Sequence, residues 1–125
     1  MENKIFAKEL ERRTKMFAIK ILKLSGKLPG TIEGKVVRNQ ISKSGTSIGA
    51  NYRESNRSRS KADFVSRIKI AESEASETVY WLEIIQELCW GEEACIQEML
   101  KESNELLAIF TSISKTLNSN SNSNS

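Results

Sequence analysis

The chain has 125 residues, of which 38% are hydrophobic, and this length suits one domain with a single core. Only one proline and six glycines occur, so the frequent turns of an all-β protein are excluded and we expect an all-α fold. No apolar run approaches the roughly 20 residues of a membrane span, and the charged N-terminus lacks the apolar segment of a secretory signal. We therefore expect a cytoplasmic protein with no membrane partner.

The net charge of +3 conceals a division between the two halves of the chain. Residues 1–61 carry 15 Lys or Arg and 5 Asp or Glu, whereas residues 62–125 carry 4 and 11. A division of this size indicates either a basic surface for an acidic partner such as nucleic acid, or pairing of oppositely charged helices within or between subunits. Helix pairing needs no outside partner, and the sequence alone leaves both interpretations open.

The first helix is predicted over residues 5–27. Large apolar side chains recur on one of its stripes, with Phe6 at the start. Pro29 and Gly30 end this helix, because proline disfavours helix at the preceding residue and glycine permits a turn. Thr31 is then placed to cap the next helix.

The second helix is predicted to run from Thr31 to about Asn56, and its buried face is narrow. Gly45 and Gly49 lie one turn apart on it. Each costs about 1 kcal/mol of helix propensity relative to alanine, so we expect a neighbouring helix to pack close to this stretch of backbone.

The third helix is predicted to begin at Ser60, three residues before Asp63, where the hydroxyl and the carboxylate can both accept hydrogen bonds from free backbone N–H groups, and to end at Gly91. Its core residues alternate at steps of four and three, as in a bundle seam. A second apolar stripe lies on a different face, which indicates contact with another subunit. The members of this second stripe are Ile70, Trp81, Ile84 and Leu88.

The fourth helix is predicted over residues 92–117, with acidic residues at its start, where the helix dipole favours them. Residues 118–125 alternate Asn and Ser and are expected to form a disordered tail. The folded domain would then comprise residues 1–117. Four amphipathic helices with short connections predict an antiparallel up-down-up-down four-helix bundle.

Residues for catalysis or metal binding are scarce. The chain contains no His, so the carboxylates of the third helix cannot form the Glu-x-x-His sites that bind metals in bundles. Cys89 and Cys95 also lack a His base, and we expect both to be reduced and buried or half-buried. We expect neither a cofactor nor an enzyme activity.

The connection between the second and third helices is the candidate binding site. Its basic residues could contact several phosphates, and Tyr52 could stack on a base. Alternatively, Asn51 and Glu54 could join the arginines in a hydrogen-bonded network that only fixes the turn. The candidate nucleic-acid-binding residues are Arg38, Lys43, Arg53, Arg57, Arg59 and Lys61.

A motif in this region resembles one family. The chain is similar, from about Phe6 to Leu117, to the bacterial four-helix-bundle proteins encoded in intervening sequences of 23S ribosomal RNA genes. It departs from the family pattern at Lys43 and at Ser73-Glu74. The residues that carry the resemblance are Gln40-Ile41, Ser44, Ser47-Ile48-x-x-Asn51-x-x-Glu54, Arg59-Ser60-Lys61-x-Asp63-Phe64, Ile70-Ala71 and Glu77.

The resemblance implies a cytoplasmic homopentamer without an established enzyme activity. More distantly similar bundles are accessory proteins of diversity-generating retroelements, which implies RNA or DNA and a reverse transcriptase as partners. Two functions therefore stay open: an adaptor associated with nucleic acid, and a self-assembling scaffold that binds an unknown protein and uses its charge division only for subunit pairing.

Overall fold

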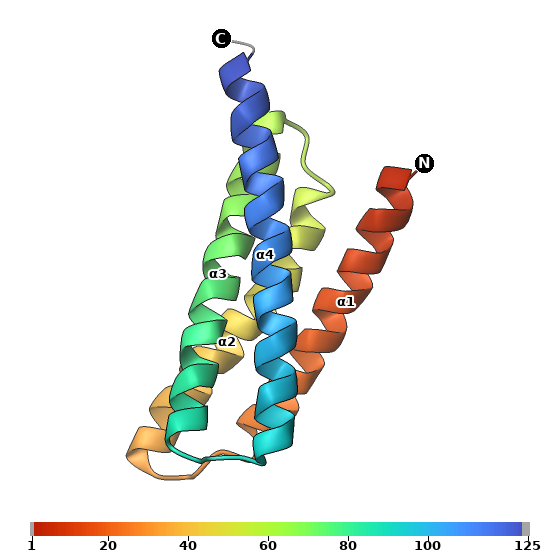
Figure 1. Ribbon diagram of the computed structural model, residues 1–125. Helices are drawn as coiled ribbons and strands as arrows, with labels where there is room; N and C mark the ends of the chain where they lie inside the picture. Colours follow the sequence, from red (N-terminus) through yellow and green to blue (C-terminus); the bar gives the residue numbers. More distant parts are fainter. Residues whose placement is uncertain (1, 124–125) are drawn as a thin grey trace.

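The computed structural model describes residues 2–123. This part of the chain folds into four helices: α1 (Glu2–Ser25), α2 (Ile32–Ser55), α3 (Lys61–Glu87) and α4 (Glu93–Ser123). Consecutive helices run antiparallel and pack side by side (Figure 1). The predicted all-α, up-down-up-down four-helix bundle is confirmed.

The helix starts follow the predicted capping. Thr31 Oγ1 accepts a hydrogen bond of 3.0 Å from the backbone N–H of Gly34. Ser60 Oγ accepts one of 3.1 Å from the N–H of Asp63. Both bonds satisfy backbone donors that have no partner within the helix.

The predicted end of α3 at Gly91 is wrong. The helix ends at Glu87, and Cys89 takes the left-handed conformation with a φ of 56°. The N–H of Cys89 donates to the carbonyl of Gln86 at 3.1 Å, and the N–H of Trp90 donates to that of Ile85 at 3.1 Å. These two bonds form a Schellman motif, which usually has glycine where this chain has Cys89, so sequence reasoning favoured the nearest glycine.

The expected tail also needs correction. α4 continues as a helix to Ser123, through most of the segment that was expected to be disordered from residue 118. The segment contains neither proline nor glycine, and adding a residue to an existing helix is much easier than nucleating a new one. Asn124 and Ser125 lie outside the described residues.

Gly45 and Gly49 of α2 lie where α1 packs close to the backbone of α2. A Cβ atom at Gly45 would lie 2.7 Å from Cγ2 of Ile21, and one at Gly49 would lie 2.9 Å from Oγ1 of Thr14. Both distances are too short for real atoms, and Ile21 and Thr14 are fully buried. The predicted close approach to the backbone of α2 is therefore confirmed.

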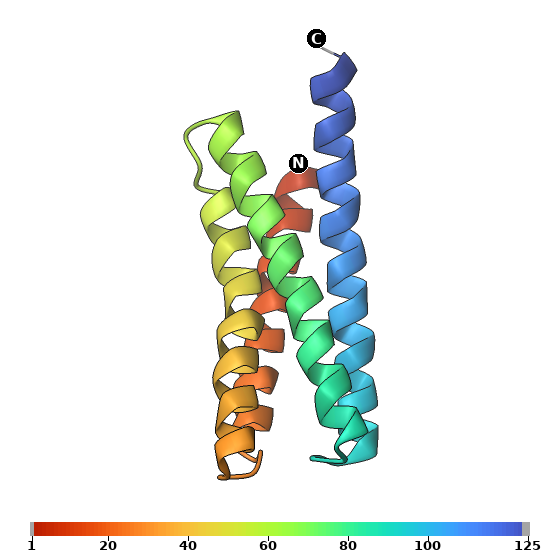
Figure 2. The ribbon, with the colours of Figure 1, turned by 90° about the vertical axis from the view of Figure 1, so that its left-hand side faces the viewer.

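The bundle is open along one seam. α1 packs on α2 but barely touches α4, and its N-terminal end diverges from the other helices (Figure 1; Figure 2). The prediction that Phe6 begins the core stripe is wrong, because this divergence leaves its side chain 50% exposed.

Among residues 2–123, no helix is long and apolar enough to cross a membrane.

Candidate nucleic-acid interface

The connection between α2 and α3 is held by its own backbone and by serine hydroxyls. The N–H of Arg57 donates to the carbonyl of Glu54 at 3.0 Å, and that of Ser58 donates to Ser55 at 3.1 Å. The Ser58 hydroxyl donates to the same Glu54 carbonyl at 3.3 Å. The side-chain amide of Asn51 donates a hydrogen bond to the carbonyl of Ser47 in the preceding turn. The turn is thus fixed without the guanidinium groups, contrary to the predicted arginine network.

Four basic side chains surround this connection, and we call them the corner cluster: Arg53, Arg57, Arg59 and Lys61. All four are exposed. None of them forms an ion pair within the described part of the chain, whereas Arg12, Arg13 and Arg67 each have a carboxylate partner. The corner cluster therefore presents positive charge that the protein itself does not neutralise.

The structure does not bring Arg38 and Lys43 into this cluster. At 1.5 Å per residue, Lys43 lies about 15 Å and Arg38 about 22 Å along α2 from Arg53. Arg38 is half-buried. Lys43 lies beside Glu74 of α3: burial and the charge of Glu77 raise the pKa of Glu74 above its usual value, and the charge of Lys43 partly opposes them. Lys43 thus takes part in the attraction between α2 and α3.

Tyr52 is not available for stacking on a base, contrary to prediction. Its side chain is 3% exposed, and its ring packs edge-on against Phe110 with the centroids 5.5 Å apart. Burial raises the pKa of Tyr52 above its usual value. This tyrosine belongs to the core.

The second stripe of α3 divides into two pairs. Ile70 is 41% exposed and Leu88 49% exposed. Trp81 and Ile84 are half-buried and pack against the core. Tyr80, 56% exposed with its ring edge-on to Trp81, adds apolar surface that the periodicity did not mark, because it lies off the stripe.

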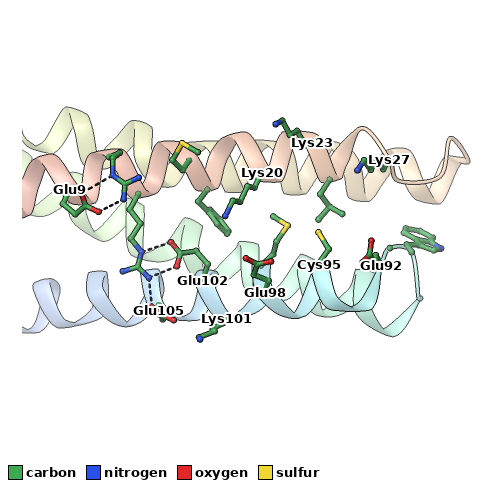
Figure 3. Close-up of a pocket in the computed structure, with 18 residues that line it drawn as sticks. Glu9, Lys20, Lys23, Lys27, Glu92, Cys95, Glu98, Lys101, Glu102 and Glu105 are labelled. Atoms are coloured by element: carbon green, nitrogen blue, oxygen red, sulfur yellow. Dashed lines mark hydrogen bonds and ion pairs between the residues drawn. The ribbon is translucent and has the colours of Figure 1, made fainter.

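Sequence reasoning missed a groove between α1 and α4, with a volume of about 970 Å³ (Figure 3). At one end Arg13 crosses the seam: its guanidinium donates to both carboxylate oxygens of Glu102, at 2.6 and 2.7 Å, and to Glu105 at 2.6 Å. Beyond this crossing the helices are not tied together by any ion pair among the described residues. Helical periodicity gives the face of each helix but not the distance between two faces, so no sequence signal marked the groove.

Both cysteines are exposed, which corrects the prediction that they are buried or half-buried. Cys89 lies in the turn after α3. Cys95 lies in the first turn of α4 and lines the groove, where no side chain of α1 covers it.

Comparison with known proteins agrees with the fold and the motif. The profile of the family described as "23S rRNA-intervening sequence protein" matches residues 8–112. The chain is also similar to the crystal structure of a protein of unknown function from the S23 ribosomal protein family of Bacteroides thetaiotaomicron VPI-5482. The two are 35% identical with a TM-score of 0.77, and the match covers 84% of this chain and 97% of the other. No curated protein matches. The match of the family profile over most of the bundle places this chain in the family of 23S rRNA-intervening sequence proteins.

Proposed function

We propose that the protein is a homo-oligomeric adaptor without enzyme activity that binds the phosphate backbone of nucleic acid through the corner cluster. The observation that carries this proposal is the contrast among the basic residues: Arg53, Arg57, Arg59 and Lys61 are exposed and without ion pairs in the described chain, although acidic residues neutralise arginines elsewhere. Phosphate oxygens are suitable partners for such groups. The N-terminal part of α1, which carries the exposed Lys4 and Lys8, lies at the same end of the bundle as this connection (Figure 1).

The proposal is tested with a double substitution in the corner cluster. For duplex DNA, each phosphate contact contributes about −0.9 to the slope of log K against log salt. The loss of one contact therefore makes this slope shallower by about 0.9. Arg57→Ala combined with Arg59→Ala is expected to reduce the slope of log K against log salt by about two. Because the contacts are to phosphate, the loss should be equal for two unrelated sequences.

A matched control removes two positive charges elsewhere. Lys35 lies at the opposite end of α2 from the corner cluster, and Lys101 lies on α4; both are exposed. The double variant Lys35→Ala with Lys101→Ala should keep most of the wild-type slope of log K against log salt. Equal losses in the two double variants would show that net charge, rather than the corner cluster, drives binding. Nucleic acid that copurifies with the wild type and is removed by salt would support the same proposal.

The oligomer is the second part of the proposal, and the family resemblance favours a pentamer. It is supported by the exposed apolar side chain of Leu88 one turn from Ile84, and by that of Ile70 on the same face about 16 Å along α3 from Trp81. A ring needs two different surfaces on each subunit, and the basic α1–α2 side and the acidic α3–α4 side are complementary. Trp81→Glu should break the assembly and keep the helical content, because a charge there would be desolvated without a partner.

Light scattering coupled to size exclusion measures the assembly. Ser76→Glu adds the same charge to an exposed position of α3 that lies about 120° around the helix from the stripe, and it serves as the control. A wild-type mass of one 14.1 kDa chain would contradict the oligomer. An unchanged mass in Trp81→Glu would contradict this interface.

The alternative is a self-assembling scaffold that binds a protein rather than nucleic acid. The apolar stripe of α3 supports it, since exposed apolar patches mark protein contacts. In that case the wild type would assemble but would show no salt-sensitive binding to RNA or DNA at low ionic strength. The resemblance to retroelement accessory proteins adds a reverse transcriptase as the partner to examine under either function.

A further inference from the structure

The groove between α1 and α4 has an apolar floor. Phe17 and Leu24 of α1 and Met99 of α4 form it, and all three belong to the buried core. Met16, which is 43% exposed, and the half-buried Trp90 line the groove above them. Since the three floor residues are at most 6% exposed, the apolar surface that an occupant can reach comes mainly from Met16 and Trp90.

Beyond the Arg13 crossing the two walls differ in charge: the charged residues that line the α1 wall are basic, and those that line the α4 wall are acidic apart from Lys101 next to the crossing. Lys20 and Lys27 come from α1 and the turn after it, and Glu92 and Glu98 come from α4 and the turn before it (Figure 3). All four are exposed, and none is in an ion pair within the described chain. Opposite charges on the two walls attract each other, yet no ion pair joins these four residues across the groove as one does at Arg13.

The dimensions suit a helix. From Met16 to Lys27, beyond the Arg13 crossing, the wall is about 17 Å long at 1.5 Å per residue, or about three helical turns. The groove is open along its length, so an occupant can lie in it without being enclosed (Figure 3). An amphipathic helix laid into an apolar groove is a common form of recognition.

We propose that this groove binds an amphipathic helix of a partner protein, with an apolar stripe on the floor, acidic residues along the edge that faces α1 and basic residues along the edge that faces α4. Nucleic acid does not fit, because its phosphates would approach Glu92 and Glu98. A helix with both edges of one sign would meet repulsion at one wall.

The exposed apolar faces of α1 and α3 do not match that description. The stripe of α3 has Glu74 and Glu77 beside it, and would bring acidic groups to the acidic wall. The outer face of α1 carries Lys8 and Lys15 and would bring basic groups to the basic wall. The charge pattern therefore favours a different protein over a second copy of this chain.

The groove and the corner cluster lie toward opposite ends of the bundle. The groove reaches the turn between α3 and α4, whereas the corner cluster surrounds the turn between α2 and α3 (Figure 1). A partner helix and nucleic acid could then be held at the same time. The inference does not depend on nucleic-acid binding, and each site is tested by its own variants.

The test uses three synthetic helical peptides of about 16 residues that share one apolar stripe and differ only in their edges. The first peptide has Glu on one edge and Lys on the other, the second has Glu on both and the third has Lys on both. Binding to the full-length protein is measured by fluorescence anisotropy at low salt. The mixed-edge peptide is expected to bind about tenfold more tightly than either of the others, since each of them loses several ion pairs of modest strength and gains repulsion.

Charge reversal of one wall makes the prediction sharper. Lys20→Glu combined with Lys27→Glu makes both walls acidic, so the preference should change to the peptide with Lys on both edges. The control, Lys8→Glu combined with Lys15→Glu, makes the same charge change outside the groove and should keep the original order. An unchanged order in the groove variant, or the same change in the control, would overturn the proposal.

The position of the bound peptide can be read from Cys95. A bimane label on Cys95, in a Cys89→Ser background, should shift its emission when the mixed-edge peptide binds, because Cys95 lines the groove. The same label on Cys89, in a Cys95→Ser background, should shift less. A larger shift at Cys89 would overturn the location. If a groove variant fails to bind the peptide and its assembly also differs in mass from that of the wild type, a second copy of the chain occupies the groove. This result would equally overturn the proposal.

Discussion

Replacing Gly45 by Ala tests the close contact between α1 and α2. The new methyl group would lie 2.7 and 2.8 Å from Cγ2 and Cγ1 of Ile21, which is fully buried and cannot move freely. Overpacking of this kind costs about 1–3 kcal/mol, while replacing glycine in a helix gains about 1 kcal/mol of propensity. The free energy of unfolding should therefore fall by about 1 kcal/mol, although alanine is the better helix former.

A double-mutant cycle separates these two effects. Ile21→Ala alone should cost about 2–5 kcal/mol, because it leaves a cavity. In the Gly45→Ala background it also removes the clash, so the two single losses should sum to more than the loss of the double variant, by the overpacking cost of about 1–3 kcal/mol. Urea denaturation at one fixed protein concentration measures all four proteins, since assembly would make stability depend on concentration.

Gly30→Ala is the matched control for this cycle. No heavy atom lies within 4 Å of the position of the added Cβ, and the φ of Gly30 is not in the left-handed region. This change should be neutral or stabilise the protein by up to about 1 kcal/mol. If Gly45→Ala gave the same gain and showed no coupling to Ile21, the close approach of α1 and α2 would be refuted.

Three further changes test the core and its titrating groups. Ile48→Asp should abolish the cooperative thermal transition in circular dichroism, because Ile48 is fully buried and an unpaired charge there costs several kcal/mol; a normal transition would show that this face is not in the core. Burial raises the pKa of Tyr52 above 10.0, so the folded protein favours the neutral phenol and loses stability as the pH rises past that value; Tyr52→Phe should lose less stability than the wild type over the same alkaline range. Burial, and then Glu77, raises the pKa of Glu74 above 4.5, so its ionised form is disfavoured in the folded state at neutral pH. Glu74→Gln should therefore raise the melting temperature at pH 7, and this gain should disappear below pH 4.5.

The fold could be predicted because the signals that specify it are local. Apolar residues at steps of four and three along each helix indicate its buried face, and Ile41, Ile48 and Ile68, which follow this spacing, are all fully buried. Thr31 and Ser60 cap helices as predicted because a cap involves only the next three residues. The same reasoning failed at Cys89, because this residue adopts the left-handed conformation typical of glycine and a cysteine in the sequence does not indicate the end of a helix.

The candidate sites could be predicted only in part, because they depend on how distant segments pack. The sequence grouped six basic residues, but the rotation and rise of α2 separate Arg38 and Lys43 from the corner cluster. It assigned Tyr52 to a ligand, although the contact with Phe110, far along the chain, buries it. The α1–α4 groove depends on the divergence of two helices that are the first and the last in the chain, and no short-range pattern encodes that distance.

The measurement that tests the central proposal most directly is the salt dependence of nucleic-acid binding by the wild type. If the four residues of one corner cluster each contact a phosphate, the slope of log K against log salt should be about −3.6 for duplex DNA and about −2.8 for single-stranded RNA. Two unrelated sequences of each kind should give the same slopes. A slope close to zero, or no binding at low ionic strength, would contradict the assignment of the corner cluster to phosphate.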